Sequence, residues 1–249
     1  MEPIGVPEIR ARIERDNPWW ADGELEIPES KLQRRVYYAT FKALALNFDV
    51  KRAAILLGPR RVGKTVMIKQ LIYEAIRSGI DPKLILYASI DAPIYSGVSL
   101  EKFIDFLPNN SKDMRRVVIF DEIQYLKDWE IHMKDLVDNY PETKFIASGS
   151  AAAALRLKSR ESGAGRFSEF MLPPLTFYEF LKFIGDDDKL ILVKGPHEYA
   201  AKDLDALNSS FVDRAGPTNL NNPISGFPVQ SGHDMPRQHG EPHAQTIPP

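Results

Sequence analysis

The stretch that most constrains the fold of this chain is Gly58-Pro59-Arg60-Arg61-Val62-Gly63-Lys64-Thr65. A short apolar run, residues 53–57, leads into it, and apolar residues at helical spacing follow it over residues 66–72. The pattern predicts a strand, a phosphate-binding loop and a helix in succession, because the glycines let backbone N–H groups close around a phosphate chain. A chance match in an ordinary strand-turn-helix connection is the alternative, and the correct flanks on both sides argue against it.

The positions of this loop predict different contacts with a nucleotide. Lys64 would reach the β- and γ-phosphates, and Thr65 would offer its hydroxyl to a Mg²⁺ ion. The positive end of the following helix adds to the same site. The residues predicted to bind the nucleotide are Gly58, Pro59, Arg60, Arg61, Val62, Gly63, Lys64, Thr65 and Val66.

The bulk composition excludes several other classes of protein. The 249 residues are 43% hydrophobic, enough for a substantial core, and their formal net charge of -2 gives no electrostatic footprint for nucleic acid. The absence of cysteine excludes disulfides and thiolate metal sites and fits a reducing compartment. Residues 1–8 do not resemble a signal peptide, and no apolar run has membrane-spanning length. We therefore expect a soluble, cytoplasmic protein.

Two carboxylates follow a second apolar run, Val117-Val118-Ile119-Phe120. Such a run is typical of a parallel strand buried on both faces, so Asp121 and Glu122 would lie at the sheet edge that faces the phosphate loop. Asp121 could then hold the Mg²⁺ shell opposite Thr65, and Glu122 could orient the water that attacks the γ-phosphate. An Asp-Glu helix cap is the alternative.

A third strand end carries small polar residues, in Lys144 to Ser150. Ser148 is predicted to contact the γ-phosphate or the attacking water, while Ser150 fits better as the cap of an alanine-rich helix that follows. Farther on, Arg166 follows a glycine-containing loop and precedes a strand predicted over 167–172. An arginine in such a place can stabilise the transition state of phosphoryl transfer, with Arg160 as the second candidate.

The remaining segments are less specific. Trp19 and Trp20 are expected to pack over a core edge, with base stacking as the alternative. Ser30 is expected to cap a helix that runs from Lys31 to about Asn47, with Arg34 and Arg35 on its solvated face. Further strands and helices are predicted over residues 8–14, 84–89, 99–106, 129–140, 176–183 and 203–208. Residues 215–249 lack a sustained period and predict a disordered tail.

Several of these motifs together resemble the AAA-type ATPases common in archaea and bacteria. The resemblance rests on residues 58–65, on Phe120-Asp121-Glu122-Ile123-Gln124 with Trp129, and on residues 148–150, 165–166 and 172–180 in that order, and it covers about residues 15–213. It implies an α/β fold, a P-loop NTPase three-layer sandwich with a parallel sheet. That sheet would have an extra strand between the Walker A strand, which leads into the phosphate loop, and the Walker B strand, which ends at Asp121-Glu122. It supports the roles given above to Lys64, Thr65, Asp121 and Glu122, and it leaves Arg166 to act in cis, in trans or only in packing.

The same resemblance suggests a domain plan. We expect an amino-terminal helical segment over 1–48, the ATPase domain over 49–185, the start of a carboxy-terminal region over 186–213, and a disordered tail over 214–249. Members of the family usually continue into a carboxy-terminal domain, so the fading of the match after Asp213 suggests a truncated or frame-altered member.

The predicted activity is Mg²⁺-dependent ATP hydrolysis coupled to a conformational change or to a partner. A nucleotide-binding interaction module with little hydrolysis and a small-molecule kinase are the alternatives. A homo-oligomer and a protein partner stay open, nucleic acid enters only by analogy with the family, and no membrane is expected.

Overall fold

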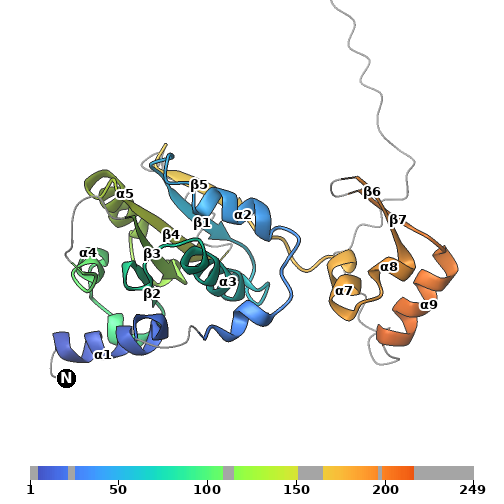
Figure 1. The fold of residues 1–249 in the computed structure, drawn as a ribbon, viewed down its shortest axis with the longest axis horizontal. Coiled ribbons are helices and arrows are strands. Elements are labelled where there is room, and N and C mark those ends of the chain that lie inside the picture. The colour runs from blue at the N-terminus through green and yellow to red at the C-terminus, as the bar shows by residue number, and fades with distance from the viewer. Residues whose placement is uncertain (1–4, 22–25, 109–114, 151–164, 196–197, 216–249) are drawn as a thin grey trace, which may run out of the picture. The chain divides into compact units, whose positions relative to one another are not determined.

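The computed structural model describes residues 5–21, 26–108, 115–150, 165–195 and 198–215. The chain divides into two units at residue 189. The first unit is built on a parallel sheet of five strands in the order β2-β3-β4-β1-β5 (Figure 1). The strands are β1 (Ala53–Leu57), β2 (Ile85–Ser89), β3 (Arg116–Asp121), β4 (Thr143–Gly149) and β5 (Phe167–Met171). The expected α/β class with a parallel sheet is confirmed, and β4 lies between β1 and β3.

Helices cover both faces of this sheet. They are α1 (Val6–Asp16), α2 (Tyr38–Ala45), α3 (Lys64–Arg77), α4 (Leu100–Ile104) and α5 (Trp129–Asn139), and α7 (Phe177–Ile184) follows β5. Residues of α1, α4 and α5 share one buried cluster, whereas residues of α2 and α3 share the other. Alternate residues of each inner strand enter the two clusters, as Ile55 and Leu56 do. This is why the strands read as continuous apolar runs.

The amino-terminal segment closes the β2 edge of the sheet. The Asn17 amide donates to the Tyr87 carbonyl (2.8 Å) and accepts from the Tyr87 N–H (2.6 Å), as a neighbouring strand would. The indole N–H groups of Trp19 and Trp20 both donate to the Ile85 carbonyl. The tryptophans therefore pack over a core edge as expected.

The predicted helix from Lys31 to Asn47 is wrong in its first part. A short 3₁₀ turn, Pro28–Lys31, contains Ser30, and the α-helix begins only at Tyr38. Arg34 is partly exposed and pairs with Glu74, but Arg35 is 8% exposed and does not lie on a solvated face. Arg35 instead forms a buried ion pair with Glu179, 144 positions away, and local propensity could not anticipate such a contact.

The second unit contains an antiparallel hairpin and a helix. The hairpin consists of β6 (Ile191–Gly195) and β7 (Glu198–Ala201), preceded by the short α8 (Asp187–Leu190) and followed by α9 (Leu204–Ala215). The helix expected near 203–208 is therefore present, whereas the hairpin was not predicted. The tail that was expected to be disordered lies, from residue 216 on, outside the described residues. Within those that are described, no helix combines the length and apolar character needed to cross a membrane.

Candidate nucleotide site

The phosphate loop connects β1 to α3, as its flanks predicted. A Cβ at Gly58 would lie 2.5 Å from the backbone oxygen of Leu172, so any side chain there would force the backbone to shift. Gly63 has a φ of 91° and nothing within 4 Å of its would-be Cβ, so its requirement is conformational. The two glycines are thus needed for different reasons. Gly58 allows close approach to the segment that follows β5, and Gly63 allows the left-handed turn that leads into α3.

Lys64 is the first residue of α3 and is only 4% exposed. Its ammonium donates to the carbonyls of Gly58 (3.1 Å) and Pro59 (2.8 Å), so it spans the mouth of its own loop. Burial lowers the pKa of Lys64, and the nearby carboxylates of Glu122 and Asp121 oppose that effect. The helix that starts here has 14 residues and directs its positive end at the loop, which favours an anion.

Asp121 receives three side-chain hydroxyls at the end of β3. Thr65 donates to its Oδ2 at 2.8 Å, and Tyr87 donates to the same oxygen at 2.9 Å. The Ser148 hydroxyl donates to Oδ1 in a short hydrogen bond. Asp121 is 1% exposed and Ser148 is fully buried. The structure thus brings Thr65, Asp121 and Ser148 together, from three different elements, as their positions at strand and helix ends predicted.

Glu122 has a left-handed backbone, with φ of 54° and ψ of 44°. This conformation is uncommon for a residue with a side chain and marks a position where the surrounding structure imposes the geometry. Its N–H donates to the Ser148 hydroxyl at 3.1 Å. The Gln124 amide donates to Glu122 Oε2, and its carbonyl accepts from the Ser150 N–H at 3.0 Å.

Two residues of this site were missed from the sequence. Tyr87 occupies an inward position of an apolar strand and looks like core, and burial and the Asp121 carboxylate raise the pKa of its hydroxyl. Gln124 belongs to the motif that carries the family resemblance, but nothing in the sequence assigned it a role beside Glu122. Both act on acidic residues that the sequence did identify.

The structure does not bring Arg166 to this site. Arg166 immediately precedes β5, and its carbonyl accepts from the N–H of Ala53 at the start of β1. It therefore lies at the amino end of the sheet, opposite the phosphate loop, and its guanidinium pairs with Asp138 at 2.8 Å. Contact with a phosphate bound to the same chain does not fit this position. Arg160 and the helix expected after Ser150 lie outside the described residues.

The donor set suits Mg²⁺ held together with phosphate. No group of three or more histidine, cysteine or acidic side chains could hold a metal in the part of the chain that the structure describes. Mg²⁺ in nucleotide sites usually takes one or two protein oxygens and completes its shell with phosphate oxygens and water. The Thr65 hydroxyl and the Asp121 carboxylate, 2.8 Å apart, provide that kind of partial shell.

Comparison with known proteins gives one family. The family model described as "AAA domain" matches residues 50–181 of this chain. A protein of Methanocaldococcus jannaschii is 29% identical over 137 residues, which are 53% of this chain and 28% of that protein. A protein of Haemophilus influenzae is 28% identical over 148 residues, 58% of this chain and 37% of that protein. Both are described as uncharacterized, and the match spans well under half of their length.

The crystal structure of RIF2 from Saccharomyces cerevisiae aligns with a TM-score of 0.44 at 12% identity, over 82% of this chain and 75% of that one.

Proposed function

The chain belongs to the AAA-type P-loop ATPase family, and we propose that it binds ATP with Mg²⁺ and hydrolyses the bond to the γ-phosphate. The observation that carries this proposal is the convergence of Thr65, Asp121 and Ser148 beside Glu122 and the phosphate loop. Family membership alone supports nucleotide binding. The paired carboxylates, one held by hydroxyls and one at a strained backbone position, support hydrolysis.

Each side chain has a task that its surroundings suit. The loop N–H groups and Lys64 hold the phosphates, with Lys64 exchanging its carbonyl partners for phosphate oxygens. Thr65 and Asp121 would hold the Mg²⁺, which supplies charge neutralisation to the phosphates. Glu122 orients the attacking water and accepts its proton, and Ser148 fixes both Asp121 and the Glu122 backbone. Catalysis then consists of positioning and charge stabilisation.

Two separate substitutions test the proposal. Glu122→Gln should bind ATP with unchanged affinity and lose roughly 10²- to 10⁴-fold in turnover, because the amide cannot accept the proton. Lys64→Ala should lose most of the binding itself. Glu142→Gln, an exposed glutamate outside the site, is the matched control and should behave as the unaltered protein. Full turnover in Glu122→Gln would contradict the assignment of Glu122 as the residue that accepts the proton of the attacking water.

One observation favours a weaker form of activity. Arg166 lies away from the phosphate loop of its own chain, so we propose that it contributes to catalysis only in trans, through a second copy. The chain alone would then act as a nucleotide-binding interaction module with little hydrolysis. ATPase activity measured over a range of protein concentrations separates the two: specific activity that rises with concentration supports the trans arginine, and specific activity that stays constant contradicts it.

A further inference from the structure

An ion pair between Arg35 and Glu179 is buried beside the phosphate loop. The side chains are 8% and 0% exposed, and the guanidinium binds the carboxylate through two hydrogen bonds of 2.6 and 2.9 Å. Burying such a pair adds little stability over apolar residues of similar size, since both charges lose their hydration. Its contacts with the rest of the site therefore indicate what it contributes.

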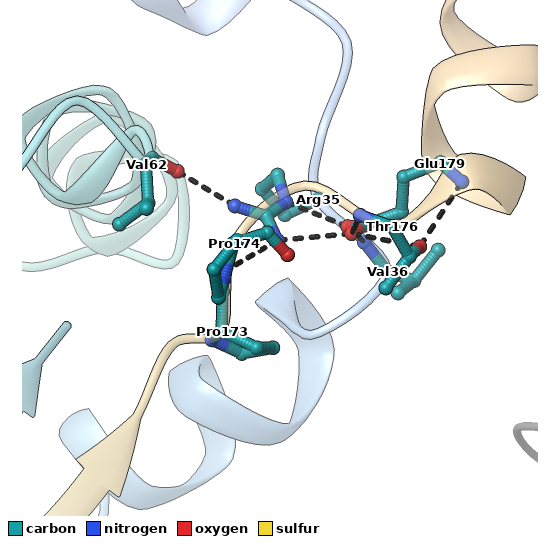
Figure 2. Close-up of polar contacts among 7 residues, drawn as sticks. All are labelled: Arg35, Val36, Val62, Pro173, Pro174, Thr176 and Glu179. Carbon is teal, nitrogen blue, oxygen red and sulfur yellow. Dashed lines mark hydrogen bonds and ion pairs between the residues drawn. The ribbon is translucent and has the colours of Figure 1, made fainter. Parts of the chain in front are cut away.

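Arg35 also donates hydrogen bonds to backbone oxygens of two segments. It donates to the carbonyl of Val62, in the phosphate loop, at 2.6 Å. It also donates to the carbonyls of Pro173 at 3.0 Å and Pro174 at 3.3 Å, in the segment that leaves β5. Figure 2 shows the guanidinium between the Val62 carbonyl on one side and Glu179 on the other. One rigid side chain thus joins the loop to the connection that leads to α7.

Glu179 fixes the other end of this connection. It lies in the first turn of α7, where its carboxylate accepts from the N–H of Thr176 at 3.2 Å and its own N–H donates to the Thr176 hydroxyl at 3.2 Å. The N–H of Val36 donates to the same carboxylate at 3.1 Å. The capping box that starts α7 therefore shares its carboxylate with Arg35.

The contact with Val62 determines where the next N–H of the loop points. None of the peptide bonds in the described part of the chain is cis, and in a trans peptide the C=O and the following N–H point in opposite directions. Because Arg35 holds the Val62 oxygen on its own side, the N–H of Gly63 is directed away from Arg35. Gly63 and Lys64 are the loop positions at which phosphate is expected to bind.

We propose that Arg35 is a positioning residue for the nucleotide, which orients the Val62–Gly63 peptide toward the phosphates and couples their binding to the start of α7 through Glu179. The inference rests on the proposed nucleotide site. Phosphate binding tightens the loop around Arg35, and Arg35 in turn holds the capping box closed. The coupling is reciprocal. The factor by which bound nucleotide favours the docked α7 equals the factor by which displacement of α7 weakens nucleotide binding.

The test compares variants at two adjacent arginines. Arg35→Lys keeps the charge but loses the planar fork, so it cannot hold Val62 and Glu179 together. We expect its ATP dissociation constant, from equilibrium titration with a fluorescent ATP analogue, to rise about tenfold, with kcat within about twofold of the unaltered protein. The ATP dissociation constant of Arg35→Gln should rise further. Arg34→Gln is the control, since Arg34 pairs with Glu74 and stacks on Tyr38 instead, and its affinity should not change.

Hydrogen exchange in the unaltered protein provides the second measurement and does not depend on a variant that folds. Amides of residues 177–185 should exchange at least about threefold more slowly with saturating nucleotide, and Arg35→Lys should abolish that difference. Affinity of Arg35→Lys within twofold of the control, or exchange of α7 that nucleotide leaves unchanged, would overturn the proposal. Lys64→Ala shows separately whether nucleotide binds at the loop, so a failure of the proposed function is distinguishable from a failure of this inference.

Discussion

The hydroxyl of Thr65 donates a hydrogen bond of 2.8 Å to Asp121 Oδ2, and so joins the first turn of α3 to the end of β3. The two residues are 56 positions apart, yet they provide neighbouring oxygens at one edge of the sheet. Tyr87 donates to the same carboxylate oxygen from β2. The aspartate is therefore fixed by neighbours before any ion is bound, which reduces the reorganisation that binding requires.

Removal of the Thr65 hydroxyl should weaken the use of magnesium more than the binding of the nucleotide base. In Thr65→Ala we expect the Mg²⁺ concentration for half-maximal turnover to rise by more than about tenfold, because one of the two protein oxygens of the shell is lost. Thr65→Ser keeps the hydroxyl and is the control. A magnesium titration at fixed ATP measures the change, and equal half-saturation in the two variants would contradict the assignment.

Ser148 should affect turnover through the two residues that it holds. Its hydroxyl donates to Asp121 and accepts from the N–H of Glu122, so Ser148→Ala releases both. We expect turnover to fall roughly 10- to 100-fold with ATP affinity within about twofold. Ser150→Ala retains the N–H that Gln124 uses and should keep most of the activity. Single-turnover kinetics distinguish this loss from slow product release.

Gly58→Ala should harm both the fold and the site. The new methyl group would lie 2.5 Å from the Leu172 oxygen, a backbone atom that cannot move aside cheaply. We expect a loss of about 1–3 kcal/mol in the free energy of unfolding, together with weaker ATP binding. Gly97→Ala has open space around its Cβ and a φ of 77°, so it should cost about 1 kcal/mol and leave binding intact. Urea unfolding and nucleotide titration check both.

The parts of the site that the sequence predicted share one property. Asp121 ends one continuous apolar run, and Lys64 and Thr65 follow another across the phosphate loop. In a parallel sheet the carboxyl ends of such runs meet at one edge whatever the lengths of the connections. Local pattern was enough to place them. The same reasoning does not place Arg166 at that edge of its own chain, because a residue that precedes a strand lies at the opposite edge from one that follows it.

Contacts between distant segments account for what could not be predicted. Arg35 and Glu179 are far apart in the sequence, and each alone resembles an ordinary surface charge, so neither the buried pair nor the late start of α2 has a local signal. The hairpin of β6 and β7 escaped for another reason. Leu192 and Val193 are adjacent and both exposed, so the strand lacks the alternation that reveals a half-buried sheet.

The ion pair of Arg35 and Glu179 predicts a dependence of stability on acid pH. Burial acts to raise the pKa of Glu179, but Arg35 and the N–H groups of Thr176 and Val36 outweigh it, so the net shift is downward. A carboxyl whose pKa is lower in the folded than in the unfolded state adds stability above its unfolded pKa, about 4.3 for glutamate. That contribution is lost as the pH falls through the folded pKa.

Comparison of Glu179→Gln with the unaltered protein over pH 3 to 7 measures this contribution. At pH 7 the variant should lose about 3–5 kcal/mol in the free energy of unfolding, because Arg35 is left as a buried charge without its partner. Below about pH 4.3 the difference should shrink, since the unaltered carboxylate becomes protonated as well. Glu74→Gln is the control, because Glu74 pairs with Arg34 and Lys42 at the surface and should cost about 1 kcal/mol or less. A difference for Glu179→Gln that stays constant with pH would show that the lost stability comes from packing and not from charge.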